Sequence, residues 1–146
     1  TKPKEALIRG IIPFFTVVVI FVAPFLIWNS KAFIDSTLGY LSGSVPHSYP
    51  ISGYGFGMVL KSFGFISNVK EYFPFIILQA IFSLPLFYLL SKFLRKNATV
   101  KTLIIAYTLL LFVFWYFSRY FNNSHVGYIS TLLIIAYFWP KEIAKA

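Results

Sequence analysis

The residues best suited to chemistry gather in one short polar run, Ser118 to Tyr128 (SRYFNNSHVGY), between two apolar stretches. Arg119 stands near the start of this run, and Asn122 and His125 follow it closely. An arginine guanidinium is a planar, charged fork that matches the oxygens of a phosphate group. The run therefore predicts one of two things. It either binds a phosphorylated lipid or its sugar, or it carries an arginine that contacts ordinary lipid phosphates beside a solvated turn.

A second set of candidate binding residues lies in the segment 29–71. His47 and Tyr49 are flanked by prolines that restrict the backbone, and a tyrosine ring can stack on a sugar or a lipid head group. Asp35 offers a carboxylate to a cation or a sugar hydroxyl, or else it lies on the surface of a helix that Asn29 and Ser30 can cap or itself serves as a cap. One carboxylate does not make an acid–base pair, so none of these residues is predicted to be catalytic.

Two other kinds of site are not expected. The chain has no cysteine, two histidines and four acidic residues, which leaves no cluster with the spacing of metal ligands. Gly53, Gly55 and Gly57 lack the preceding strand and the spacing of a dinucleotide-binding loop. They predict instead a tight turn at which the backbone approaches a neighbour closely. No metal and no cofactor are predicted.

The composition indicates that lipid is the solvent of this protein. Hydrophobic residues make up 58% of the chain and charged residues 12%, whereas a soluble domain carries roughly 25% charge. The net charge of +9 raises the question of nucleic acid. However, the basic residues separate long apolar runs, as loop charges do in multi-pass membrane proteins, and form no contiguous basic face. Nucleic-acid binding is therefore not expected.

These features predict an all-α integral membrane protein with about four transmembrane helices, forming a single membrane domain over residues 1–146. A bilayer needs about 20 apolar residues for each helical pass. The predicted passes are residues 10–28, 72–91, 102–118 and 120–140. The last of them is the weakest, because polar side chains occupy its first turns. Since the chain begins with Thr1 rather than methionine, we expect an N-terminally truncated fragment of a larger multi-pass protein.

The distribution of lysine and arginine predicts the orientation in the membrane, because cytoplasmic loops are enriched in both. A cytoplasmic N-terminus leaves Lys31, Lys61, Lys70 and Arg119 on the outer side. It places on the inner side Lys2, Lys4, Arg9, Lys92, Arg95, Lys96, Lys101, Lys141 and Lys145. Both termini are then cytoplasmic, and the segment 29–71 lies outside. Within it, residues 54–66 are too short and too polar to span, so they predict an interfacial or re-entrant helix.

Three parts of the chain together resemble a known family. They are residues 24–33 (PFLIWNSKAF), residues 49–55 (YPISGYG) and the arginine-containing loop 118–120. The pattern is similar to the C-terminal half of multi-pass membrane glycosyltransferases of the GT-C class, in particular the polyprenyl-phosphate-mannose-dependent mannosyltransferase-like family 87 and its prokaryotic relatives. Where that family often has aspartate, this chain has Asn29.

The resemblance implies transfer of a mannose-like sugar from a polyprenyl-phosphate donor on the outer face of a prokaryotic plasma membrane. It places the catalytic carboxylate in an upstream outer loop, so this part would contribute the lipid-phosphate and acceptor pocket. Arg119 would then neutralise the donor phosphate, with Tyr49, His47, Asn122 and His125 as supporting contacts. The partners would be the bilayer, the lipid-linked sugar and the missing N-terminal part. The alternative is a non-enzymatic subunit of a transporter, flippase or lipid-binding complex.

Overall fold

The computed structural model describes residues 3–140, which are mostly helical. In chain order, the elements are α1 (Pro3–Ile34), the π-helix η1 (Asp35–Gly39), α2 (Tyr40–Ser42), β1 (Ser52–Gly53), α3 (Phe56–Ser62), α4 (Phe75–Lys96), α5 (Val100–Tyr116), β2 (Tyr120–Phe121) and α6 (Asn123–Phe138). The predicted helical class is confirmed, although two short strands are added to it. Lys2, Lys141 and Lys145, which entered the charge count, lie outside the described residues.

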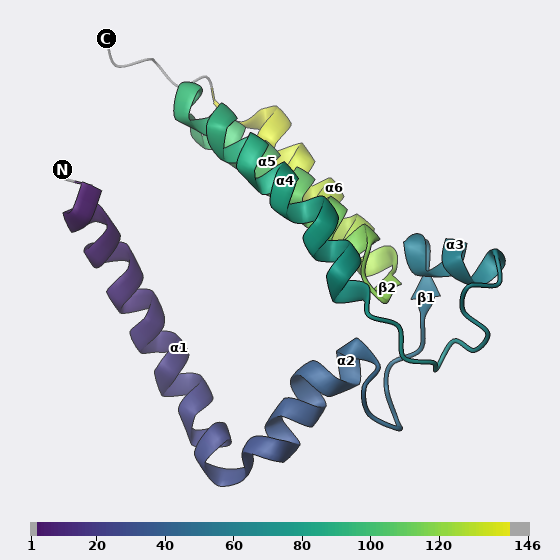
Figure 1. The fold of residues 1–146 in the computed structure, drawn as a ribbon. Helices are drawn as coiled ribbons and strands as arrows, with labels where there is room; N and C mark the ends of the chain where they lie inside the picture. The colour runs from purple at the N-terminus through teal and green to yellow at the C-terminus, as the bar shows by residue number, and fades with distance from the viewer. Residues whose placement is uncertain (1–2, 141–146) are drawn as a thin grey trace.

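The helix α1 bends sharply at Asn29, so that the first part of the chain forms a V (Figure 1). Asn29 has φ −155° and ψ 86°, far from helical values. Its side-chain oxygen accepts a hydrogen bond from the backbone N–H of Ala32 at 2.9 Å. This is the geometry of a helix N-cap, and it confirms the predicted cap. The second arm of the V continues through η1 and α2.

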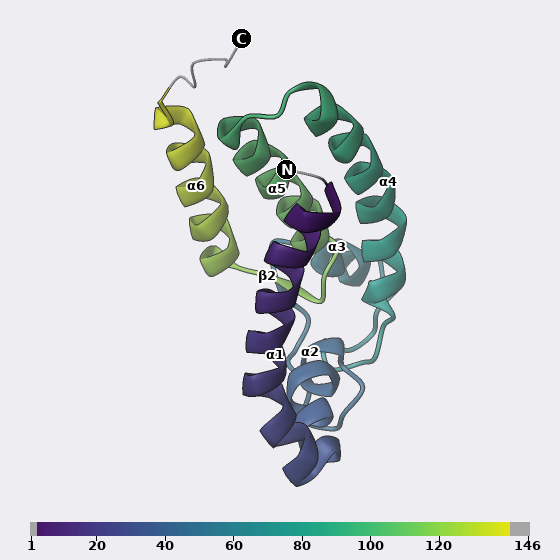
Figure 2. The same cartoon turned by 90° about the vertical axis from the view of Figure 1, so that its left-hand side faces the viewer.

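The helices α4, α5 and α6 lie side by side, with α5 in the middle (Figure 2). A short turn joins α4 to α5, and the side chain of Thr99 caps α5 by accepting from the backbone N–H of Thr102 at 3.1 Å. This turn, the start of α1 and the end of α6 lie toward one end of the molecule (Figure 1). The distribution of lysine and arginine predicts that these same three regions lie together on the cytoplasmic side. The side of a membrane on which they lie stays a prediction.

Among residues 3–140, two helices are long and apolar enough to cross a bilayer, judged by length and composition. They are Ile8–Ser42, which includes the bend, and Phe75–Lys96. Along α1 the apolar side chains are exposed, up to 86% for Ile27 and 90% for Trp28. Such a continuous apolar surface is unfavourable in water, because each exposed apolar group costs free energy. These helices therefore support association with a membrane.

The connection between α5 and α6 is longer than the single residue that the predicted passes left between them. The third pass was expected to end at Ser118 and the fourth to begin at Tyr120, but α5 ends at Tyr116 and α6 begins at Asn123. The hydroxyl of Ser118 donates to the carbonyls of Trp115 and Tyr120, each at 2.6 Å. These bonds replace helical hydrogen bonds and turn the chain into β2.

Away from the start of α1 and the end of α6, β1 and β2 form a two-stranded parallel sheet (Figure 1). Ser52 lies opposite Tyr120, and Gly53 lies opposite Phe121. Gly53 has φ +90°, and a Cβ there would lie 2.0 Å from the carbonyl oxygen of Phe121. A Cβ on Gly55 would lie 2.9 Å from the Cβ of Phe121. The predicted close approach of this glycine-rich turn to a neighbour is therefore confirmed.

The helix α3 falls within the segment 54–66 that was expected to be interfacial or re-entrant. Its side chains include Met58, which packs against a small buried cluster of Ile51, Ile66 and Phe75. The helix therefore lies against the protein's own core, which joins the β1 region to the start of α4. Its position relative to a bilayer stays a prediction.

Candidate functional site

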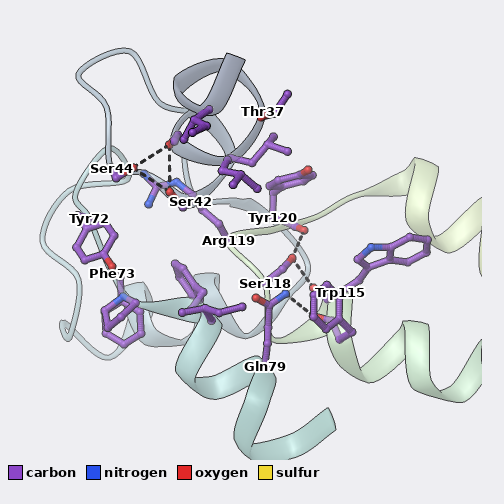
Figure 3. A pocket seen from close by; sticks show the side chains of 18 of the residues that line it. Thr37, Ser42, Ser44, Tyr72, Phe73, Gln79, Trp115, Ser118, Arg119 and Tyr120 are labelled. Carbon is purple, nitrogen blue, oxygen red and sulfur yellow. Dashed lines mark hydrogen bonds between the residues drawn. The ribbon is translucent and has the colours of Figure 1, made fainter. Parts of the chain in front are cut away.

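A cavity of about 660 Å³ opens where η1 meets the start of α4 and the end of α5 (Figure 3). Its wall combines apolar side chains with hydroxyl groups, an amide, a carboxylate and a guanidinium. The polar lining includes Asp35, Ser42, Ser44, Gln79, Ser118 and Arg119. A volume of this size is typical of small-molecule sites, as is a mostly apolar wall with a few polar groups.

The side chain of Arg119 is buried in the cavity wall, where the residue is only 2% exposed. Its Nε donates a hydrogen bond to the carbonyl of Tyr49. Its Nη1 and Nη2 donate to the carbonyls of Glu71 and Val69, at 2.8 and 3.2 Å. The guanidinium also lies against Gly43, where a Cβ would meet Nη1 at 2.2 Å. Arg119 thus holds the loops before β1 and before α4 against the end of α5.

The positive charge of Arg119 has no carboxylate partner among residues 3–140. Glu71 offers it only a backbone carbonyl, because the Glu71 carboxylate accepts from the backbone N–H groups of Ser67 and Asn68. Burial lowers the pKa of Arg119 because water no longer stabilises the charge, but a guanidinium stays protonated at neutral pH. Each terminal nitrogen uses one of its two N–H groups. The other has no partner in the described part of the chain.

A buried amide, that of Gln79, adds a second polar group to the cavity wall (Figure 3). Gln79 is 8% exposed, and its Nε2 donates to the carbonyl of Phe114 at 3.0 Å. That carbonyl lies in the last turn of α5, where the helix has no further N–H to offer it. The bond therefore ties the first turns of α4 to the end of α5, beside Ser118.

Asp35 lines the same cavity from the side of η1. Its carboxylate accepts from Lys31 Nζ at 2.7 Å, and the Lys31 side chain is 86% exposed. The charge of Asp35 is therefore balanced by a surface lysine one helical turn away. Of the six residues predicted to bind substrate, Asp35 and Arg119 are the two that the structure brings into the cavity wall.

Two further predicted residues, His47 and Tyr49, are not part of the cavity lining. The carbonyl of Tyr49 is a partner of Arg119, and its ring centroid lies 4.8 Å from that of Tyr120. His47 is exposed. Tyr49 thus acts on the site through the position of Arg119.

The last two predicted residues, Asn122 and His125, cap the helix α6. The side chain of Asn122 accepts from the backbone N–H of Ser124 at 3.2 Å. In return, Nδ1 of His125 accepts from the backbone N–H of Asn122 at 3.3 Å. This reciprocal arrangement is a capping box, which satisfies backbone donors at the start of a helix. Neither residue lines the cavity.

Gln79 was not among the predicted binding residues, and Ser118 entered the sequence analysis only as the first residue of the polar run 118–128. A signal for Gln79 was present, because an amide inside the apolar run 72–91 is costly in a bilayer unless it faces protein or a polar ligand. No local sequence pattern predicted the hydrogen-bond acceptors that hold the Arg119 guanidinium. They are backbone carbonyls, and every residue has one.

No family model matches this chain, and no curated protein or solved structure does so either. Within residues 3–140 there is also no group of three or more histidine and acidic side chains placed to hold a metal ion. The cavity and the apolar helices around it are therefore the features of this chain that indicate a function.

Proposed function

We propose that this chain is part of a multi-pass membrane glycosyltransferase, and that its cavity binds the phosphate of a polyprenyl-phosphate-linked, mannose-like sugar on the outer side of a prokaryotic plasma membrane. The observation that supports this proposal is the buried guanidinium of Arg119, which lines the cavity without a carboxylate partner among the described residues. A buried charge of this kind is costly unless something compensates it. A phosphate group has the charge and the geometry to do so.

The position of the cavity suits an amphipathic ligand. Its wall includes Ile34, Leu38 and Ile76, apolar side chains that would contact a hydrocarbon chain. The polar groups come from the ends of α4 and α5 and from η1, which we place at the head-group level of the outer leaflet. A lipid phosphate would then meet Arg119 while its chain remains in the bilayer.

In a sugar transfer from such a donor, the bond between the sugar and the phosphate oxygen breaks, and the phosphate leaves with additional negative charge. A fixed positive group beside that oxygen stabilises the developing charge. Arg119 would act in this way, held in place by three carbonyls. The base that takes the proton of the acceptor hydroxyl would come from another part of the protein, because Asp35 is paired with Lys31.

The topology of four passes is proposed together with this function. The chain has no cysteine, so single cysteines can be introduced at the exposed positions His47 and Asn97 and labelled with a membrane-impermeant maleimide in intact cells. We expect labelling of His47→Cys from outside, and labelling of Asn97→Cys only after the membrane is opened. Labelling of Asn97→Cys in intact cells would overturn the orientation.

The role of Arg119 can be tested by solid-state NMR, because the only other arginines are Arg9 and Arg95. A protein with Arg9→Lys and Arg95→Lys, labelled with ¹⁵N-arginine, would be reconstituted in bilayers with farnesyl mannosyl phosphate. Dipolar dephasing between ³¹P and the guanidinium ¹⁵N is expected, as in a direct contact. Without dephasing at saturating ligand, Arg119 is only a structural clamp, and the proposed site is wrong.

A further inference from the structure

The oxygen of the Gln79 amide is an unused hydrogen-bond acceptor in the cavity wall. A backbone carbonyl only accepts, so the group that faces the Phe114 carbonyl at 3.0 Å must be the amide nitrogen. The side-chain oxygen therefore points the other way (Figure 3). It makes no hydrogen bond with the residues that the structure describes, although Gln79 is 8% exposed. The oxygen stays accessible, since among the described residues Ser83 Oγ is the one fully buried polar side-chain atom without a partner, so a ligand donor would take the place of water at the Gln79 oxygen.

Ser118 presents a second acceptor to the same cavity. Its single hydroxyl hydrogen is directed at the carbonyls of Trp115 and Tyr120, each 2.6 Å away. The lone pairs of its oxygen are then what the side chain has left to offer a ligand. Beside it in the chain, Arg119 offers only donors. The wall thus presents a cationic donor next to neutral acceptors.

This pattern distinguishes between classes of phosphate ligand. A phosphodiester oxygen accepts hydrogen bonds, so it complements the free N–H groups of Arg119 and the second N–H of Gln79, but not the side-chain oxygens of Gln79 and Ser118. A hydroxyl group donates, so it complements those two acceptors. A ligand that satisfies the whole wall therefore carries an anionic phosphate and, next to it, a hydroxylated substituent.

We propose that Gln79 is a specificity-determining residue that reads a hydroxyl group on the substituent of the bound phosphodiester. The inference rests on the proposed function, because it presumes that Arg119 binds the phosphate. The shared chemistry of the ligand is a lipid phosphodiester bearing a polyol. Its two sources are a sugar on an isoprenyl phosphate and the glycerol head group of a phospholipid.

The experiment compares charge-matched ligands with and without hydroxyl groups. Native mass spectrometry of the protein in phosphatidylcholine nanodiscs would measure the affinities for farnesyl mannosyl phosphate and farnesyl methyl phosphate. A second arm would compare phosphatidylglycerol with phosphatidylmethanol. Both members of a pair carry the same phosphodiester, so the ratio of their affinities reports only the contribution of the hydroxyl groups. The arm with the larger ratio identifies the source of the ligand.

The wild-type protein is expected to bind the hydroxylated member of one pair about tenfold more tightly than its methyl analogue, as one well-made hydrogen bond to an otherwise unpaired acceptor allows. Gln79→Leu should reduce this ratio to about one. The matched control is Ser83→Ala on the same helix. Ser83 is buried and its hydroxyl has no partner in the described residues, but it does not line the cavity. This control should retain the ratio.

The possible outcomes separate this inference from the proposed function. If the wild type binds both members of each pair equally, or if the ratio survives in Gln79→Leu, Gln79 does not read a hydroxyl, although the phosphate site stands. If the wild type binds none of the four ligands, the phosphate site itself is wrong. Should Gln79→Leu fail to fold, Gln79→Asn decides, because its shorter side chain withdraws the oxygen and should also abolish the ratio.

Discussion

The guanidinium of Arg119 lies directly against the backbone of Gly43, so closely that a Cβ at Gly43 would sit 2.2 Å from Nη1. Gly43 has φ +92°, a left-handed conformation that L-residues rarely adopt. This glycine ends α2 and at the same time leaves room for the arginine. The placement of the buried charge therefore depends on a residue far from Arg119 in the sequence.

Replacement of this glycine should destabilise the protein by more than backbone strain alone. Gly43→Ala introduces a left-handed alanine, which costs about 1–2 kcal/mol, and it also displaces Arg119 from its three carbonyls. The matched control is Gly64→Ala, since Gly64 has φ +77° but nothing within 4 Å of the added Cβ. Thermal unfolding in detergent should show a clearly larger loss for Gly43→Ala. Equal losses would mean that Arg119 moves aside freely.

Replacing Arg119 with lysine should destabilise the loops that the guanidinium holds together. Arg119→Lys keeps the charge but has one nitrogen where three N–H groups now reach three separate carbonyls, so about 2–4 kcal/mol of stability should be lost. Arg95→Lys serves as the control, because Arg95 is exposed in the last turn of α4. Its effect should lie within about 0.5 kcal/mol. Chemical denaturation in mixed micelles would measure both, and equal stability of the two variants would contradict the clamp.

The cap of α6 offers a test that separates folding from binding. Asn122→Ala removes the side-chain acceptor of the Ser124 N–H and should cost about 1 kcal/mol, as N-cap losses do. Affinity for a lipid phosphodiester should not change, because Asn122 does not line the cavity. Asn123→Ala, at an exposed neighbouring position, should change neither quantity. A specific loss of affinity in Asn122→Ala would restore the original prediction that Asn122 contacts the ligand.

Local patterns predicted the helices of this protein well, because each depends on its own run of apolar residues. The cap at Asn29 and the close approach at Gly53 were predicted for the same reason, since both follow from the needs of the backbone nearby. The ends of the predicted passes differ from the helix ends throughout, by two to seven residues, and the segment between the last two passes is one example. There, side-chain bonds from Ser118 turn the chain out of the helix, and hydropathy does not detect them.

The site could be predicted only in part. Arg119 was identified because a charge beside an apolar run is conspicuous, and it does lie in the cavity wall. Asn122 and His125 were grouped with it because they are neighbours in sequence, yet their side chains accept from backbone N–H groups at the start of α6. The partners that hold Arg119, at Tyr49, Val69 and Glu71, come from distant loops. Their contribution is a carbonyl, which carries no sequence signal.

The bend at Asn29 should depend on the oxygen of its side chain. Asn29→Ala removes the acceptor of the Ala32 N–H, so the two arms of α1 should lose their fixed angle and the helix should be free to continue straight. Asn29→Asp should preserve the bend, because a carboxylate accepts the same bond and is favoured at a helix N-terminus. Ser30→Ala should also preserve it, since no hydrogen bond involves the Ser30 side chain in residues 3–140.

Spin labels on this cysteine-free chain can report the bend directly. Labels at the exposed positions Val19→Cys on α1 and Leu89→Cys on α4 would be measured by pulsed electron resonance in nanodiscs. The native protein, Asn29→Asp and Ser30→Ala should give the same narrow distance distribution, and Asn29→Ala should broaden or shift it. If the Asn29→Ala distribution superimposes on the native one, the bend is set by the lipid environment rather than by the cap. In that case η1 and Asp35 would be held at the cavity by their own contacts alone.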